Sequence, residues 1–394
     1  MRGPYAWFLS GASSWSLAFG LNQVVFSWLL VGELREDADR VGFAQMCLVL
    51  PSLLFLLPGG LLADRSDLRR VTLGVQASAA LASAALAAAV GLGWLSLPLL
   101  AAYALVWGTI QAFNGPARDA LLSHVAGGDL LRAITGLTLA QFAANAVGSR
   151  LGGVAEVFGS GRTLFVQAGV LVAGVALTSR LPRTRTQVPE TERPRTPAAL
   201  ADGLRIVRRS PQLRPIAWLV AANGIFYMGP FQVLCPLIVR DVYGGDVGTL
   251  ASAMMMLPLG CIAGSLAILW RGGLEHKGAV FLLALLGVAL CLIGFVTRPP
   301  FPLFAAGIFA WGVFHSLFVN TSRTLFQQAA PPSHRAQVLA VYSLGLLGMA
   351  PISSLASGVL AHHVGLLAAC ALPGAAMLAI VGFAWFATSV RRFA

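Results

Sequence analysis

The chain has 394 residues, of which 57% are hydrophobic and only 11% are charged. Soluble domains average about 45–50% and 25% in these two classes, so the composition excludes an ordinary water-soluble fold. The formal charge of +12 lies in short segments between long apolar runs, which argues against a nucleic-acid-binding face.

Twelve apolar segments are long enough to cross a bilayer core, which takes about 20 residues as a helix. We therefore predict an all-α membrane protein with twelve transmembrane helices in two six-helix bundles. The predicted spans are 5–31, 41–62, 71–93, 95–114, 133–158, 163–179, 216–239, 247–270, 279–296, 301–319, 338–360 and 366–388.

Basic residues are distributed unevenly between the two sides of these spans. With the N-terminus inside, the cytoplasmic segments hold 21 of the 27 basic residues and the outer loops hold five. Positive charge concentrates on the cytoplasmic side of membrane proteins. We expect a multi-pass protein of a bacterial inner membrane, with both termini in the cytoplasm.

One long polar stretch, rich in Pro, Thr and Arg, divides the chain. It predicts an N-terminal bundle over 1–180, a cytoplasmic linker over 181–214 and a C-terminal bundle over 215–394. The end of the linker, ALADGLRIVRR, is expected to form a short amphipathic helix on the anionic inner leaflet. At an offset of 205 residues, Phe113 matches Phe318 and Arg118 matches Arg323, as expected of a tandem repeat.

Enzymatic motifs are absent from the sequence. The only lysine, Lys277, follows a histidine, so there is no lysine-containing phosphate loop, and the HExxH and GxSxG patterns do not occur. The five cysteines are widely spaced in apolar stretches, which indicates packing residues and no metal site. We predict no enzyme activity, no cofactor and no metal.

The loop after the second span reads GGLLADRSDLRRV, over residues 59–71. It resembles the signature loop of the major facilitator superfamily, and the loops around Arg118 and Arg323 resemble those of its enterobactin and macrolide exporters. Asp67 and Leu68 depart from the usual signature. The resemblance implies a conformational latch that favours an outward-open state; plain topology-setting charge is the alternative. The residues assigned to the latch are Gly60, Asp64, Arg65, Arg69, Arg70 and Arg118.

In the family that the chain resembles, helices 1, 4, 7 and 10 line a central cavity. Polar and aromatic residues three and four apart form stripes on these helices, and intramembrane polar groups usually turn away from lipid. Helix 5 carries a further polar stripe. We assign as substrate-binding candidates Gln23, Trp107, Gln111, Asn114, Asn145, Arg150, Asn223, Tyr227, Trp311 and His315. For single Ser and Gly residues on these stripes, helix packing is the favoured interpretation.

Two charged positions raise separate hypotheses. If protons drive transport, the carriers must be Glu156 or His315, although an outer-vestibule charge and a satisfied histidine are the alternatives. Arg150 is the only basic residue inside a predicted span, so something must offset its cost in lipid. It either pairs with a polar group on helix 8 or helix 1, or contacts an anionic group of the substrate.

These features predict a secondary transporter that exports a small amphiphilic molecule, siderophore-like or drug-like, by alternating access. The expected partners are a small-molecule substrate and the lipid bilayer, and protons are a further option. No nucleic-acid partner is expected. The alternatives are an importer or lipid flippase of the same fold, and a transport-dead membrane receptor or scaffold.

Overall fold

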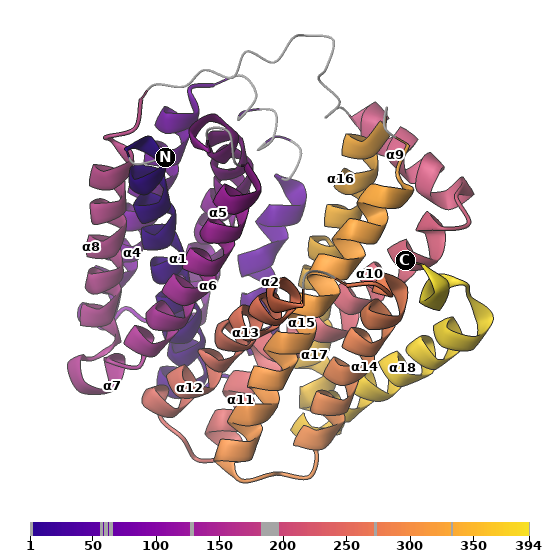
Figure 1. Ribbon diagram of the computed structural model, residues 1–394. Coiled ribbons are helices and arrows are strands. Elements are labelled where there is room, and N and C mark those ends of the chain that lie inside the picture. Colours follow the sequence, from indigo (N-terminus) through magenta and orange to yellow (C-terminus); the bar gives the residue numbers. More distant parts are fainter. Residues whose placement is uncertain are drawn as a thin grey trace. The chain divides into compact units, whose positions relative to one another are not determined.

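The computed structural model describes residues 3–55, 58, 62, 66–126, 130–182, 197–271, 274–331 and 334–393. In these ranges the regular elements are all helices (Figure 1). The latch candidates Gly60, Asp64 and Arg65 lie outside the described residues.

The first half of the sequence begins with α1, Pro4–Trp28, which continues as the π-helical segment η1, Leu29–Glu33. The helices that follow are α2 Ala38–Leu54, α4 Leu68–Gly91, α5 Leu97–Val125, α6 Leu130–Gly152, α7 Ala155–Phe158 and α8 Ser160–Thr178.

The second half begins with α9, Pro197–Arg209, and α10, Leu213–Gly229, which continues as the π-helical η3, Pro230–Leu234. The helices that follow are α11 Cys235–Asp241, α12 Val247–Met254, α13 Met256–Trp270, α14 Lys277–Phe295, α15 Phe301–Ala329, α16 Arg335–Leu347, α17 Ala350–Val364 and α18 Leu366–Ala387, with the 3₁₀ turn η5 Val390–Arg392 at the end.

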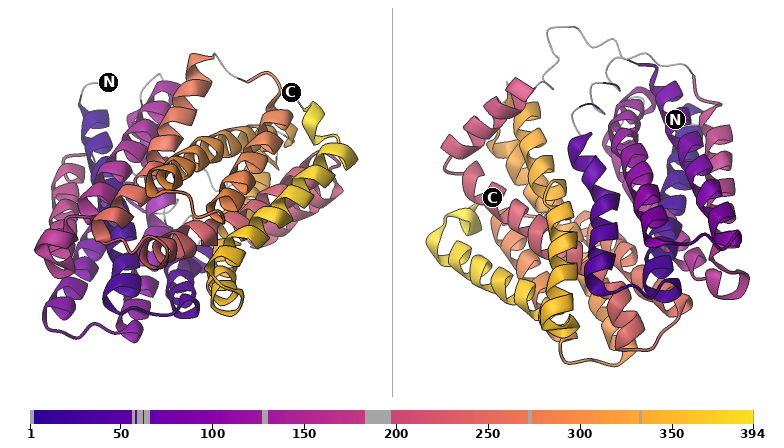
Figure 2. Two further views of the ribbon diagram at one scale, coloured as in Figure 1. Left: turned by 90° about the horizontal axis from the view of Figure 1, so that it is seen from below. Right: turned by 180° about the vertical axis from the view of Figure 1, so that it is seen from behind.

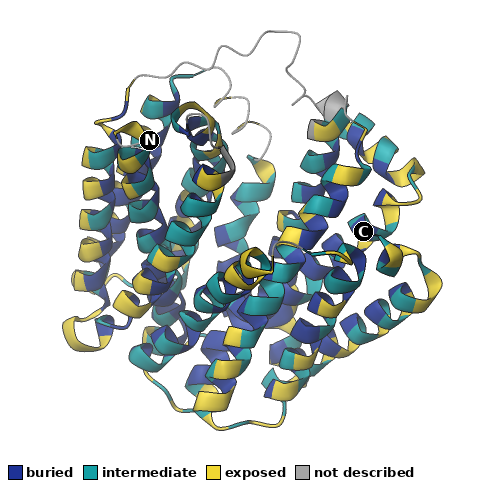
Figure 3. Ribbon diagram, in the orientation of Figure 1, coloured by how far each residue is buried: buried dark blue, intermediate teal, exposed yellow. Residues whose placement is uncertain are grey.

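Ten helices in the described part of the chain are long and apolar enough to cross a membrane. The two expected spans outside this set correspond to α2, which has 17 described residues, and to α6, which carries the polar stripe. The prediction of twelve spans therefore stays a prediction. Large exposed side chains such as Phe165 on α8 and Phe386 on α18 fit lipid contact, and exposed positions recur along both helices (Figure 3).

Several helix boundaries differ from those that the hydropathy predicts. The span expected over 95–114 is part of α5, which runs to Val125, and the span expected over 301–319 is part of α15, which runs to Ala329. Hydropathy marks only the stretch that lies in lipid, whereas helical hydrogen bonds continue beyond it. The expected spans 216–239 and 338–360 are each interrupted near a proline, Pro230 and Pro351, because proline lacks the N–H that an α-helix interior needs.

The chain forms two compact units. Unit 1 comprises Met1–Glu36, Cys47–Arg193 and Val239–Met255, and unit 2 comprises Asp37–Met46, Pro194–Ile238 and Met256–Ala394. Each unit therefore consists mainly of one half of the sequence but includes a short segment of the other half.

Unit 1 is held together by close contacts between helix backbones. Glycines on α1 and α6 allow the approach: a Cβ at Gly20 would collide with the carbonyl oxygen of Asn145, and one at Gly148 with that of Leu17. α8 packs on α1 and α4, and α5 packs on α4. Small residues at helix contacts are the usual solution in lipid, where burial of apolar side chains gives no preference for another helix.

Glycines also allow close contacts between helix backbones in unit 2. A Cβ at Gly312 of α15 would collide with the carbonyl oxygen of Leu257 on α13, and one at Gly229 of α10 would collide with that of Ser353 on α17. The amphipathic helix expected in the linker is present as α9, and it packs beside α16 (Figures 1 and 2).

The α1–α6 contact makes a direct prediction. Gly148→Ala should destabilise the protein by about 1–3 kcal/mol, because the added methyl group forces two backbones apart. A lower midpoint of thermal unfolding in detergent, followed by size-exclusion chromatography, would report this loss.

Gly169→Ala on α8 is the matched control, since its Cβ would meet no atom within 4 Å. We expect this control to be neutral or stabilising, because alanine is the better helix former. Equal midpoints for Gly148→Ala and the wild type would contradict the close-packed contact.

Candidate functional site

Aromatic side chains of α1 and α5 form a stack inside unit 1. Trp107 is 1% exposed, and its ring lies 5.8 Å from that of Trp15 and 5.9 Å from that of Tyr103, between centroids. The indole Nε1 of Trp107 has no hydrogen-bond partner within the described residues. Trp107 therefore combines an apolar surface with an unused N–H donor.

The other candidates on α1 and α5 differ in burial. Gln23 and Gln111 are half-buried, and Asn114 is buried. Asn114 lines a small pocket inside unit 1 together with Trp15, Gln76, Arg118 and Thr178. These polar groups share one side of the bundle near the C-terminal ends of α5 and α8.

A buried polar network in unit 1 has no counterpart in the sequence prediction. The Tyr103 hydroxyl donates to Asn22 Oδ1 at 2.5 Å, and Gln167 Nε2 donates to Ser83 Oγ at 2.9 Å and to Asn22 Oδ1 at 3.2 Å. The network joins α1, α4, α5 and α8. Its sequence signal is an amide in each of two apolar spans, Asn22 and Gln167, and neither of these amides belongs to a polar stripe.

The candidates on α10 and α15 lie in unit 2. Asn223 is 1% exposed, and its Nδ2 lacks a partner within the described ranges. The hydroxyl of Tyr227 donates to the carbonyl oxygen of Leu285 at 2.5 Å, and its ring meets Trp311 edge-on at 6.3 Å. His315 is half-buried and stacks on Phe318 at 6.2 Å.

Next to this group lies an apolar pocket enclosed by helices of unit 2. It contains no charged side chain, and its lining includes Phe231, Cys235, Phe295, Ile308, Trp311 and Cys370. Trp311 thus contacts both the pocket and the ring of Tyr227.

The polar stripe of α6 faces two kinds of surroundings. Ser149 is buried against α1, where its Oγ lies 3.5 Å from the carbonyl oxygen of Gly20, whereas Asn145 is half-buried. Arg150 is exposed. Its Nη1 would lie 3.2 Å from a Cβ added at Gly153, and the same Cβ would contact Ala251 of α12. Arg150 therefore lies beside the contact between α6 and α12.

Glu156, in α7, lies at the same contact. Its carboxylate occupies the space that a side chain at Gly248 of α12 would need. Asp246 caps α12 by accepting from the N–H of Thr249 at 2.7 Å and from its hydroxyl at 2.8 Å. These bonds, aided by the Glu156 side chain, hold the pKa of Asp246 below its usual range.

Unit 2 contains a corresponding contact between α2 and α17. A Cβ at Gly358 would lie 2.7 Å from the Cα of Gly42, so only glycine fits on both sides. One turn away, Nδ1 of His362 lies 3.6 Å from Oδ1 of Asp39. Gly153 and Gly358 are related by the same 205-residue offset as the other repeat positions. We call the α6–α12 and α2–α17 contacts the two glycine seams.

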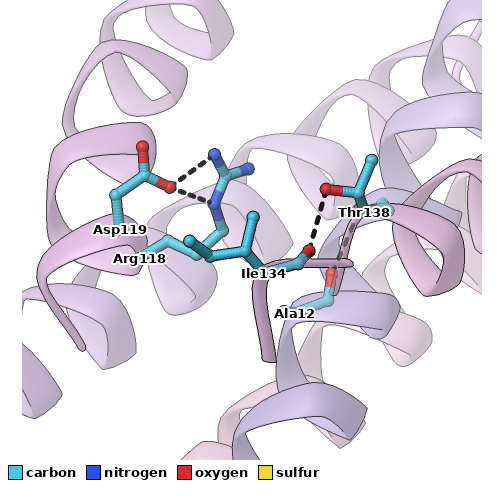
Figure 4. A network of polar contacts seen from close by, with 6 residues as sticks. Ala12, Arg118, Asp119, Ile134 and Thr138 are labelled. Atoms are coloured by element: carbon cyan, nitrogen blue, oxygen red, sulfur yellow. Dashed lines mark hydrogen bonds and ion pairs between the residues drawn. The ribbon is translucent and has the colours of Figure 1, made fainter. Parts of the chain in front are cut away.

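The described part of the latch belongs to unit 1. It lies at the helix ends of unit 1 that are opposite to the α6–α12 seam. Arg69 donates to the carbonyl oxygen of Ser179, and Arg70 lies 3.8 Å from Asp67, which caps α4. Arg118 pairs with its neighbour Asp119, its Nη2 donating to Oδ1 at 2.8 Å (Figure 4). Arg118 thus has an acidic partner on its own helix.

Comparisons with known proteins agree on one kind of molecule. Residues 6–394 match the family described as "Transmembrane secretion effector". The Staphyloferrin A transporter of Staphylococcus aureus (strain NCTC 8325 / PS 47) is 23% identical over 386 residues, covering 95% of this chain and 94% of that protein.

Two solved structures share the fold. The nucleoside transporter NupG is similar with a TM-score of 0.77 and 12% identity, covering 100% of both chains. A POT family transporter in complex with 5-aminolevulinic acid is similar with a TM-score of 0.79 and 9% identity, covering 99% of this chain and 96% of that one. The family match over nearly the whole chain shows that this multi-pass membrane protein belongs to the transmembrane secretion effectors, a family of secondary transporters in the major facilitator superfamily.

Proposed function

We propose that the protein exports a small amphiphilic, siderophore-like molecule from the cytoplasm across a bacterial inner membrane, with both of its termini in the cytoplasm. One observation carries the substrate class. Trp107 and Asn223 each keep a buried N–H donor without a described partner. Trp107 stacks on the ring of Trp15, and Asn223 lies one turn before Tyr227 on α10. Buried donors without a partner cost free energy, so each unit by itself favours a substrate that offers acceptor oxygens on an apolar frame.

The export direction is supported by the description of the matched family as secretion effectors. The siderophore-like class is supported by the relative named as a Staphyloferrin A transporter. An importer or a lipid flippase of the same fold is the second candidate. A transport-dead receptor or scaffold is disfavoured, because it has no need of buried donors without a partner.

Alternating access is proposed to work through the two glycine seams. In each seam a short segment of one sequence half docks on helices of the other half. The α2–α17 contact is between glycine backbones, whereas in the α6–α12 seam glycines leave room for the side chains of Ala251 and Glu156. We assign the seams to the outer side, and the Asp64 loop to the inner side as the latch that favours the outward-open state.

Proton coupling is proposed to act at the α6–α12 seam. A protonated Glu156 can share a hydrogen bond with the Asp246 carboxylate, whereas an ionised Glu156 sets two negative charges side by side and opposes the docking of α12. Proton uptake from the outside would then close the seam and return the carrier to its inward-open state. His315 is the second candidate for the same proton.

The direction can be tested in membrane vesicles of both orientations. Inside-out vesicles that contain the protein should accumulate a carboxylate siderophore, because export runs toward their lumen, and accumulation should rise when the lumen is made acidic. Accumulation in right-side-out vesicles alone would identify an importer instead.

The double variant Glu156→Gln with His315→Gln separates coupling from transport. We expect it to lose the response to the pH gradient while substrate still equilibrates across the membrane. A full pH response in this variant would eliminate both residues as proton carriers.

The role of Arg150 can be tested by copying the other repeat, in which Leu355 occupies the equivalent position. Arg150→Leu should insert and fold normally, since Leu355 shows that an aliphatic side chain suits the position. We expect at least a tenfold loss of transport for a carboxylate siderophore, because losing a charge-assisted hydrogen bond costs about 1.5–3 kcal/mol.

The neutral methyl ester of the same siderophore is the matched substrate, and its transport should change little. If both substrates are affected equally at normal expression, Arg150 has no contact with the substrate anion.

The seam itself can be tested with Gly358→Val. The larger side chain should hold α2 and α17 apart, at a packing cost of about 1–3 kcal/mol, and so favour the outward-open state by about tenfold. A cysteine in place of Ser354, which is fully buried, reports the opening through a faster rate of alkylation.

Gly382→Val on α18 serves as the control, because its Cβ would meet nothing within 4 Å. The seam has no gating role if Gly358→Val, folded and inserted, leaves both the alkylation rate and transport as they are in the control.

A further inference from the structure

The second unit carries an exposed helix at the point where its first long apolar helix begins. Only residues 210–212 separate α9 from α10, and α10 opens the candidate membrane span Leu213–Asp241. The turn is fixed by Ser210, whose hydroxyl accepts from the N–H of Leu213 at 3.2 Å and whose carbonyl accepts from the N–H of Arg214 at 3.1 Å. Residues 197–218, which we call the elbow, therefore join α9 directly to the start of the candidate membrane span.

One face of α9 is occupied within the protein. Gly203 and Val207 are buried, and a Cβ at Gly203 would lie 2.6 Å from the carbonyl oxygen of Gln337 on α16. Because α9 is pressed against α16 on this side, its orientation about its own axis is set. The opposite face is a shallow hollow lined by Ala201, Leu204, Arg205, Arg208 and Arg209.

The exposed face combines positive charge with an apolar side chain. Arg205 is paired with Asp202 at 2.8 Å, whereas Arg208 and Arg209 have no acidic partner within the described residues. Leu204 lies between the arginines and is 45% exposed. A free leucine among cations has no favourable surroundings in water, but it does at a lipid surface.

The elbow continues this pattern on α10. Arg214 is exposed, and Trp218, one turn further into the span, is 73% exposed. Tryptophan and arginine are typical of the headgroup level of a membrane, where the ring meets the acyl chains and the charge meets phosphate.

We propose that the elbow is a binding site for anionic phospholipid, with the phosphodiester held by Arg208, Arg209 and Arg214 and the acyl chains against Leu204 and Trp218. Guanidinium groups suit phosphate because they offer parallel N–H donors. The lipid headgroup is favoured over free phosphate, since phosphate alone leaves the two apolar side chains without a partner. On the proposed topology, the site lies in the inner leaflet.

The test measures lipid binding by the full-length protein purified in detergent. We expect short-chain phosphatidylglycerol to bind more tightly than phosphatidylcholine of the same chain length, and inorganic phosphate to compete weakly. Arg208→Gln with Arg209→Gln should weaken phosphatidylglycerol binding on the order of twentyfold, at about fivefold for each charge near an anionic lipid surface.

The matched control neutralises two exposed arginines elsewhere, Arg162→Gln with Arg298→Gln, which lowers the net charge equally. This control should bind phosphatidylglycerol like the wild type. The site is ruled out if the elbow variant binds like the wild type, or if the control loses as much affinity. Strong competition by inorganic phosphate would point to an anion site without a lipid.

A second measurement tests the apolar half of the site. The chain's own cysteines are buried or half-buried, so a bimane label on Leu204→Cys reports one position. Brominated phosphatidylglycerol should quench the label more than brominated phosphatidylcholine. Absence of quenching by either lipid would mean that α9 faces water or another protein, and the proposal would fail.

Discussion

The packing of this protein depends on how closely two helix backbones can approach where a glycine removes the side chain. In lipid, apolar side chains gain nothing by leaving the solvent, so helices must associate through short-range contact and polar bonds. Gly148 and Gly20 bring α1 against α6, and Gly312 brings α13 against α15. A single methyl group at such a position displaces a whole helix, which is why these contacts define the two units.

Glycines allow close approach both in helix pairs that stay together and in helix pairs that are proposed to separate during transport. Inside unit 1, α1 is tied to α5 and α8 by the hydrogen bonds that join Asn22, Tyr103 and Gln167, so separating these helices would expose buried polar atoms. At the α2–α17 seam, the glycine pair Gly42 and Gly358 lies one turn from the pair of Asp39 with His362. The proposed transport cycle opens and closes this contact between glycine backbones.

Hydropathy and charge predicted most of the helical architecture, because both depend on the solvent around a segment and not on its partners. They located α5 and α15 but not the ends of those helices, which continue beyond the apolar stretch. Partner choice was harder to predict. Ser149 belongs to a polar stripe yet is buried against α1, while Asn22 and Gln167, which belong to no stripe, form the buried network. Periodicity shows that a helix face is polar; whether that face meets another helix or a substrate depends on the rest of the fold.

The two seams contain glycines at equivalent repeat positions, Gly153 and Gly358, but they contain different titratable groups. This difference matters for the proposed proton coupling. The α6–α12 seam sets Glu156 near Asp246, and the α2–α17 seam sets His362 near Asp39. In the proposed coupling, two acids meet at the α6–α12 seam, whereas an acid and a histidine meet at the α2–α17 seam, so only the first seam sets like charges side by side. If both seams lie on the outer side, as proposed, an acidic exterior closes the empty carrier toward the cytoplasm. Proton entry would then reset the carrier after each release of substrate, which is the order of events that proton-driven export needs.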